Sequence, residues 1–299
     1  MTARLYQRRA RLLFGLQISA DVAGFTVDTD GASGLRIVFS VTRTTDRKAN
    51  SGKIEVYNLN AENRGRMDGN GARRVVLEAG YQDTMAGILC ADRVEVRHRR
   101  EGNDWVSTIE GGDGIRSLQT FMGGSYSPGV TSRVLLDAIV AAAQAGSGLT
   151  LATRISPAAQ TKLQDKIYAK GHVFASGTRV SDALQQVCVR AGCRVSIQDC
   201  AVEVLTADEV ASGQAILLSP STGLIGVPEH VTQRNDQGQI IAHYLKGTAL
   251  LMPGLAPSRL VSVKSDTESA NVLITRVDHS GDTHGQGQSW VTKWEGKIL

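Results

Sequence analysis

Apolar and polar residues alternate along several short stretches in the first 120 residues. The stretches with this two-residue period are 35–41, 53–59, 74–81, 87–91, 93–98 and 105–110. Such alternation is typical of half-buried β-strands. A polar loop at 42–52 and a Gly/Asn-rich turn at 68–71 separate the strands. This part of the chain is therefore predicted to be a sandwich or small barrel of short strands.

The pattern changes after a predicted linker at 125–129, where apolar residues recur three and four positions apart. One helix is predicted from an N-cap at Thr131 to Gly146, with Val134, Leu135, Ala138, Ile139 and Ala142 on its apolar face. A second is predicted from Ser156-Pro157 to Gly171, and a third from Ser181 to Gly192. A hairpin at 194–205, turning at 198–199, completes a compact α+β insert.

Strand patterns return in the last third of the chain. The predicted strands there are 239–245, 260–264, 272–279 and 289–297, preceded by a Gly/Pro-containing loop at 223–228.

A short internal repeat links the two β-rich parts. Residues 105–111 (WVSTIEG) match residues 290–296 (WVTKWEG), and the strand at 93–98 loosely matches 276–279. Each copy of the repeat, together with the strand before it, predicts a hairpin that closes a β domain. We expect a mainly β fold, with two related antiparallel β-barrels at 1–122 and 209–299 flanking a small α+β module at 123–208.

Composition supports this picture and excludes some classes of protein. The chain of 299 residues is long enough for two or three domains, and with 41% hydrophobic residues it is not disordered. Its 32 glycines and low aromatic content, 5%, suit tight turns and bulges. A net charge of +4 does not indicate a nucleic-acid clamp. The apolar stretch at 12–16 is too short for a signal peptide or membrane anchor, so synthesis in the cytoplasm is expected.

Four cysteines, Cys90, Cys188, Cys193 and Cys200, are too few for a disulfide scaffold at this length. The spacing of the last three does not fit a structural zinc site, so we expect them to pack as small hydrophobic residues. A Cys193–Cys200 disulfide across the predicted hairpin remains an alternative.

Other clusters of polar residues also have simpler structural explanations. Asp278, His279, Asp282 and His284 lie at a strand end and in a turn, and Glu110 and Asp113 lack the aromatic cleft of a glycosidase. The glycine clusters at 111–114 and 285–287 lack the spacing of a nucleotide site. No catalytic, cofactor-binding or metal-binding residues are expected.

The N-terminus is basic, with Arg4, Arg8, Arg9 and Arg11. We interpret it as a solvated arm or an arm that contacts another protein.

Several sequence segments resemble those of the baseplate hub proteins of contractile-tailed bacteriophages, which join the tail tube to the central spike. They are residues 52–60 (GKIEVYNLN), 77–81 (LEAGY), 109–114 (IEGGDG), 219–229 (SPSTGLIGVPE), 276–283 (RVDHSGDT) and 290–292 (WVT).

The resemblance implies a structural protein of the virion without enzymatic activity or cofactors. It implies a homotrimer whose two tube-like barrels per chain make six similar units, joining a sixfold tail tube to a threefold spike. Other baseplate proteins would bind it, and phage DNA would pass through without specific binding. Edge strands and extended loops, including those at 42–52 and 223–230, are the expected ring contacts. The arginine arm is an expected tube or spike contact. The alternatives are a cell-wall hydrolase and a glycan-binding tail-tip protein.

Overall fold

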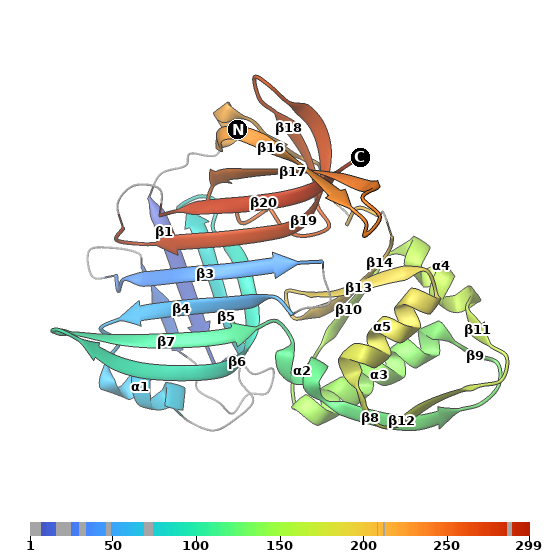
Figure 1. Cartoon of the computed structure of the whole chain (residues 1–299). Coiled ribbons are helices and arrows are strands. Elements are labelled where there is room, and N and C mark those ends of the chain that lie inside the picture. The colour runs from blue at the N-terminus through green and yellow to red at the C-terminus, as the bar shows by residue number, and fades with distance from the viewer. Residues whose placement is uncertain are drawn as a thin grey trace.

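The computed structural model describes residues 7–15, 25–29, 34–45, 49–68, 74–207, 209–211, 213–285 and 289–299. It is mainly antiparallel β structure with a small α+β module, as predicted (Figure 1). No helix within these residues is long and apolar enough to cross a membrane.

The described residues of the first part of the chain form seven strands and one helix. They are β1 (Arg8–Phe14), β2 (Phe25–Asp28), β3 (Ile37–Thr44), β4 (Ser51–Tyr57), α1 (Ala61–Asp68), β5 (Arg74–Tyr81), β6 (Ala86–Glu101) and β7 (Asp104–Gly112). The predicted strands are present, but the two expected at 87–91 and 93–98 form the single long strand β6. Helix α1 was not predicted because Met67 is its only buried residue, so it has no apolar stripe.

The arginine arm is a wrong prediction for the described residues. Arg8, Arg9 and Arg11 lie in β1, which pairs with β5 and β2. Alternate residues of β1 are buried, from Ala10 to Phe14. Arg11 forms ion pairs with Asp28 and Glu78. Arg9 and Arg11 occupy the polar positions of the strand, whereas Arg8 shares the side of Ala10 and lies over the Trp290 ring. Arg4 lies outside the described residues.

The middle part is the α+β module. Its elements are α2 (Ile115–Gln119), β8 (Phe121–Tyr126), β9 (Val130–Thr131), α3 (Ser132–Ser147), β10 (Ala152–Ile155), α4 (Pro157–Asp165), β11 (Ile167–Tyr168), β12 (His172–Arg179), α5 (Val180–Arg190), β13 (Cys193–Gln198) and β14 (Ala201–Thr206). The predicted linker at 125–129 begins inside β8.

The three predicted helices are present, and two of their caps are confirmed. Thr131 and Ser156 accept hydrogen bonds from the first turns of α3 and α4. Ser181 is not a cap, since α5 begins at Val180 without a side-chain cap.

Other details of these helices differ from prediction. Helix α4 ends at Asp165, before the expected Gly171. In α3 the buried face is rotated toward Leu136 and Val140, which leaves Val134 exposed.

The last part returns to strands, with β15 (Ile216–Leu218), the 3-10 helix η1 (Pro220–Thr222), β16 (Leu224–Arg234), β17 (Ile240–Leu250), β18 (Leu260–Lys264), β19 (Ser269–Asp282) and β20 (Val291–Ile298). The predicted loop at 223–228 is mostly strand. Its Gly and Pro residues mark an irregularity in β16, whose register shifts between Ile225 and Glu229.

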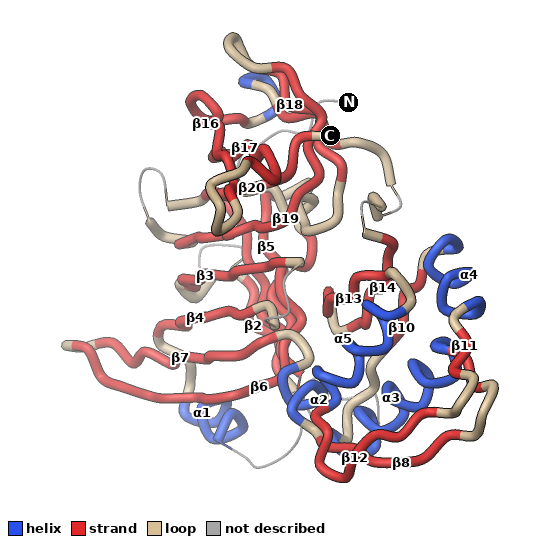
Figure 2. The backbone as a smooth tube through the Cα atoms, turned by 45° about the vertical axis from the view of Figure 1, so that its right-hand side comes forward, coloured by secondary structure: helices blue, strands red, loops and turns tan. Residues whose placement is uncertain are grey.

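One sheet joins the two β-rich parts, in the order β16-β17-β20-β19-β3-β4-β7-β6-β5-β1-β2, with β18 and β15 attached beside β19. In this sheet order, the eight strands from β16 through β19 and β3 to β6 make a front layer (Figure 1). Strands β5 and β2 cross behind it (Figure 2). The order β16-β17-β20-β19-β18 in the last part repeats the order β3-β4-β7-β6-β5 in the first.

Three hydrophobic cores follow the three parts of the chain. The first lies among β1 to β7, the second within the module, and the third among β15 to β20. Leu251 of the last part also belongs to the first core, as does Trp290, which precedes β20. Trp290 packs edge-on against Phe39 with ring centroids 5.3 Å apart.

Candidate functional site

The repeated hairpins β6–β7 and β19–β20 match residue by residue in their pairing. In both hairpins the register of the first strand shifts at the same place, and a glutamate of the repeat pairs with the residue that follows the shift. Glu110 pairs with Glu95 in one hairpin, and Glu295 pairs with Arg276 in the other. The next glycine is crowded in both. A Cβ at Gly111 would lie 2.7 Å from the Asp92 carbonyl oxygen, and one at Gly296 would lie 2.6 Å from that of Leu273. The bulge therefore requires glycine in each copy.

A histidine pair extends this equivalence. The His98 Nδ1 lies 2.9 Å from Ser107 Oγ, and the His279 Nδ1 lies 2.9 Å from Thr292 Oγ1. His279 is fully buried, and burial together with the charge of Arg43 lowers its pKa to about 3. The ring is therefore neutral at physiological pH and serves as a hydrogen-bonding core residue.

The two β units meet where β19 pairs with β3. Pairs run from Arg276 opposite Thr44 to Asp282 opposite Val38. Thr42 donates a 2.6 Å hydrogen bond to Asp278 across this joint. At one end, Arg36 donates to the two carboxylate oxygens of Asp282 from Nε at 3.0 Å and from Nη2 at 2.6 Å. The joint combines a backbone ladder with charged side-chain contacts.

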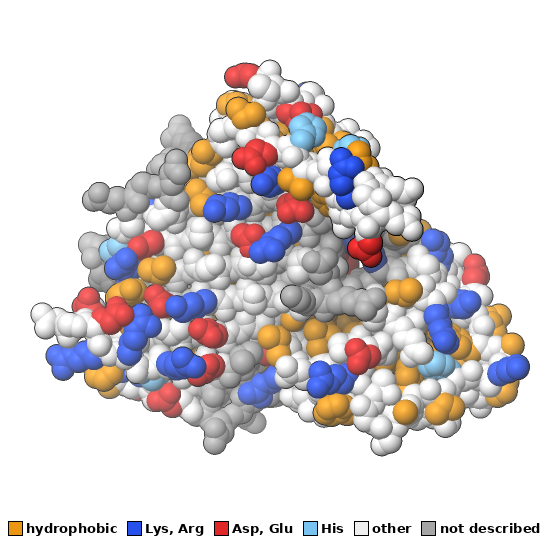
Figure 3. Space-filling view, in the orientation of Figure 1, with side chains coloured by type: hydrophobic (Ala, Val, Ile, Leu, Met, Phe, Trp, Pro, Cys, Tyr) orange, Lys and Arg blue, Asp and Glu red, His pale blue; other side chains and the backbone are white. Residues whose placement is uncertain are grey.

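The front layer has a polar face, opposite the cores, on which acidic and basic side chains alternate (Figure 3). One row of neighbouring side chains across the paired strands consists of Glu229, Lys246, Glu295 and Arg276. Neighbouring charges pair on this face, for example Lys246 with Glu229 at 3.0 Å and Lys53 with Glu55 at 3.0 Å. The face is therefore charged but locally balanced.

Two edges of the front layer are free among the described residues. Strand β6 pairs with β5 only through residues 86–92, so one edge of residues 95–101 has no strand partner there. Strand β16 pairs only with β17. Unpaired strand edges are templates for pairing with another chain.

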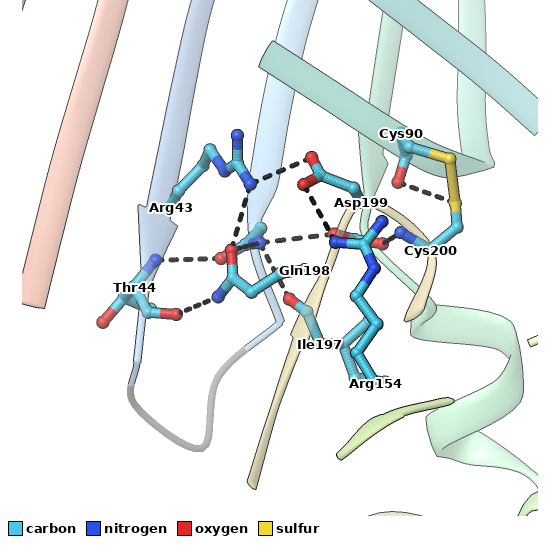
Figure 4. Close-up of polar contacts among 10 residues, drawn as sticks. Arg43, Thr44, Cys90, Arg154, Ile197, Gln198, Asp199 and Cys200 are labelled. Carbon is cyan, nitrogen blue, oxygen red and sulfur yellow. Dashed lines mark hydrogen bonds and ion pairs between the residues drawn. A yellow bond between two sulfur atoms is a disulfide. The ribbon is translucent and has the colours of Figure 1, made fainter. Parts of the chain in front are cut away.

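A buried polar cluster joins the first β unit to the α+β module (Figure 4). Asn50, just before β4, donates to the Ile197 carbonyl at 2.9 Å and to Gln198 Oε1 at 3.0 Å. Gln198 donates to the Thr44 carbonyl at 2.7 Å. Arg43 forms a 2.9 Å ion pair with Asp199. Each buried polar group thus has a partner on the opposite side of the junction, as burial requires.

A disulfide between Cys90 and Cys200 crosses the same junction. The alternative of a Cys193–Cys200 bond is wrong, because Cys200 lies in the β13–β14 turn facing β6 while Cys193 is buried in the module. Cys188 and Cys193 are free and buried, as expected for small hydrophobic residues, but that expectation is wrong for Cys200, which is disulfide-bonded. Burial raises the pKa of Cys188 to about 12.

Asp113 is the most perturbed carboxyl group of the junction. It accepts hydrogen bonds from the Cys200 amide at 2.7 Å and from Asn50 at 3.3 Å. Burial nevertheless raises its pKa to about 7. Because the folded state holds this proton up to a higher pH than the unfolded chain does, Asp113 reduces stability as pH rises from about 4 to 7.

The Asp113→Asn variant should lose this dependence. The free energy of unfolding of Asp113→Asn minus that of wild type is expected to increase from pH 5 to pH 8, as measured by urea denaturation. Contributions of other groups, including His279, cancel in the difference. Glu110→Gln, on the polar face, is the control. A difference between Asp113→Asn and wild type that does not change with pH would refute this role for Asp113.

The other candidate clusters do not assemble. Glu110 lies on the exposed polar face and Asp113 in the buried junction, so they do not share a cleft. Asp278 binds Arg276 and Thr42, Asp282 binds Arg36, and His284 contacts Thr283. The described residues contain no group of three potential metal ligands. Gly285 is described, whereas residues 286 and 287 of that glycine cluster are not.

Asn50 and Gln198 were missed by sequence reasoning. Both lie in polar stretches next to turns, where such residues are ordinarily exposed, so no local signal marks them.

Similarity to known proteins is found at the level of the fold. No family model matches the chain, and no curated protein matches its sequence. A tail protein from Neisseria meningitidis MC58 matches with a TM-score of 0.64 and 10% identity, covering 98% of this chain and 97% of the other. The 43 kDa tail protein of prophage MuSo2 from Shewanella oneidensis gives 0.63 and 9%, with 96% and 97% covered.

A third structure is a type VI secretion system component of E. coli, described as similar to T4 bacteriophage tail proteins gp27 and gp5. It matches with a TM-score of 0.59 and 9% identity, covering 90% of this chain and 75% of the other. The resemblance to phage tail proteins expected from the sequence is thus confirmed as a shared fold extending over nearly the whole chain.

Proposed function

We propose that this protein is a structural component of a phage tail baseplate: a trimeric hub that joins the sixfold tail tube to the threefold central spike. The observation that carries the proposal is the whole-length fold similarity to two phage tail proteins. The hub acts in the virion, binding tube protein on one side and spike protein on the other, with further baseplate proteins around it.

The repeated strand order supports a ring of three chains. Strand β19 of the second unit pairs with β3 of the first, and their equivalents are β6 and β16, which carry the free edges. Pairing β6 of one copy with β16 of the next repeats the contact already made inside the chain. Three copies joined in this way present six similar units in a closed ring.

The internal contact also gives the register of the contact between copies. Ser280 lies opposite Ser40 in the β19–β3 joint. Through the repeat, Arg99 corresponds to Ser280, since the two pair with the matching residues Val106 and Val291. Glu229 corresponds to Ser40, since they pair with Lys246 and Lys53. Arg99 of one copy therefore faces Glu229 of the next, with opposite charges.

The polar face suits the wall of a conduit. A ring built from front layers, with the three cores outside, turns this face toward the centre. Its alternating charges give no continuous basic surface, so DNA can pass without being held.

The oligomeric state tests the proposal. Light scattering should give three times the mass of one chain, and electron microscopy should show a threefold ring of six similar lobes. A monomer at micromolar concentration would contradict the trimeric hub.

Charge reversal tests the proposed register. Arg99→Glu and Glu229→Arg should each weaken association about tenfold or more, because like charges then face each other. The double variant should restore it. Sedimentation velocity measures the association, and Lys293→Glu, inside the layer on the same face, is the control. Single variants that associate like wild type would contradict this register.

A further inference from the structure

The Cys90–Cys200 disulfide covalently links the first β unit to the α+β module, which the chain otherwise joins directly only through the segment at 112–121. Cys90 belongs to β6 and Cys200 to the β13–β14 turn, 110 residues apart in sequence. The first β core and the core of the module share no residue.

Contacts around this link are mainly polar. Asn50, Gln198, Arg43 and Asp113 make the hydrogen bonds and ion pairs described above, and each of them is at most 3% exposed. Water can replace such bonds when a junction opens, so each contributes only modestly to holding it closed. A polar junction of this kind is expected to depend strongly on a covalent crosslink.

We propose that the Cys90–Cys200 pair is a redox-controlled lock that fixes the α+β module on the first β unit when oxidised and lets the module move away when reduced. The two cysteines differ in exposure, since Cys200 is 5% exposed and Cys90 is only partly buried. An external thiol therefore attacks the disulfide at the Cys90 sulfur.

The reaction is thiol–disulfide exchange. A thiolate of a small dithiol attacks the Cys90 sulfur, the Cys90–Cys200 bond breaks, and its electron pair leaves on the Cys200 sulfur, which takes a proton from water. The second thiolate of the dithiol then displaces Cys90 and becomes part of a cyclic disulfide. A small-molecule disulfide drives the reverse reaction, accepting the two electrons that the protein thiols lose.

Hydrogen–deuterium exchange of the full-length protein tests the lock. With dithiothreitol, the peptide covering the β13–β14 turn should exchange roughly 30-fold faster or more at Cys200, whose amide donates to Asp113 across the junction. This factor is the low end of what a disulfide typically contributes. Peptides from the centre of α3 should not change. Cys90→Ser should exchange at the reduced rate with or without dithiothreitol, and Cys193→Ala should keep the wild-type response.

Thiol labelling provides a second measurement that does not depend on any variant folding. Denatured without reductant, the oxidised protein should label at two of its four cysteines, Cys188 and Cys193. Labelling of all four after incubation with oxidised glutathione would overturn the proposal. So would unchanged junction exchange in reduced wild type. Neither result depends on whether the protein forms a trimer.

Discussion

Replacing Trp290 with alanine is expected to lower the free energy of unfolding by about 3–5 kcal/mol, the usual loss for a large aromatic residue in a core. The Trp290 side chain is 1% exposed and packs on Phe39 and over Gly281, where a Cβ would lie 2.6 Å from the indole ring. Since it fills the first core from the last part of the chain, its loss also loosens the contact between the units. Urea denaturation measures the effect.

Trp105, the matching residue in the other copy of the repeat, is the control. It is 38% exposed, and the guanidinium of Arg64 lies 4.4 Å from its ring centroid. Trp105→Ala should therefore lower stability by only about 1–2 kcal/mol. Equal losses for the two variants would show that Trp290 does not have the core role assigned to it.

Deleting residues 1–11 is expected to prevent the first β unit from folding. The deletion removes the part of β1 that pairs with β5 from Arg8 opposite Tyr81 to Arg11 opposite Glu78, and it removes the buried Ala10. It exposes an edge of β5 and opens the first core. The expected result is insoluble protein, or soluble protein without a cooperative unfolding transition by circular dichroism.

The variant Arg11→Ala tests the ion pairs of β1 separately from its strand pairing. This variant keeps the backbone of β1 and loses ion pairs with Asp28 and Glu78, whose side chains are partly exposed, so a loss below about 1 kcal/mol is expected. If the truncated protein instead unfolded like wild type, β1 would be dispensable, as the arm interpretation required.

Local patterns predicted most individual elements. The two-residue period gave β5 and β18 with their exact bounds, and the caps Thr131 and Ser156 gave the starts of α3 and α4. Arg8, Arg9 and Arg11 were misread because three arginines within four residues look like a basic arm when one partner strand of β1, the strand β5, lies more than 60 residues away.

The joint between β19 and β3 could not be predicted, since no local signal relates residues more than 230 positions apart. The repeat at Trp105 and Trp290 did predict two related hairpins. It could not show that Trp290 is buried in the first core while Trp105 is partly exposed, because burial depends on what covers each hairpin. The Cys90–Cys200 pairing was out of reach for the same reason.

The position of Trp290 has a consequence for synthesis on the ribosome. The first core stays incomplete, and β3 lacks its β19 neighbour, until the last strands have been made. Domains usually fold as they emerge, but here the earliest strands must wait for the latest, which predicts slow folding with mostly non-local contacts. A prematurely terminated chain would lack the indole that completes this core, so only chains finished past residue 290 can present the paired front layer to other copies.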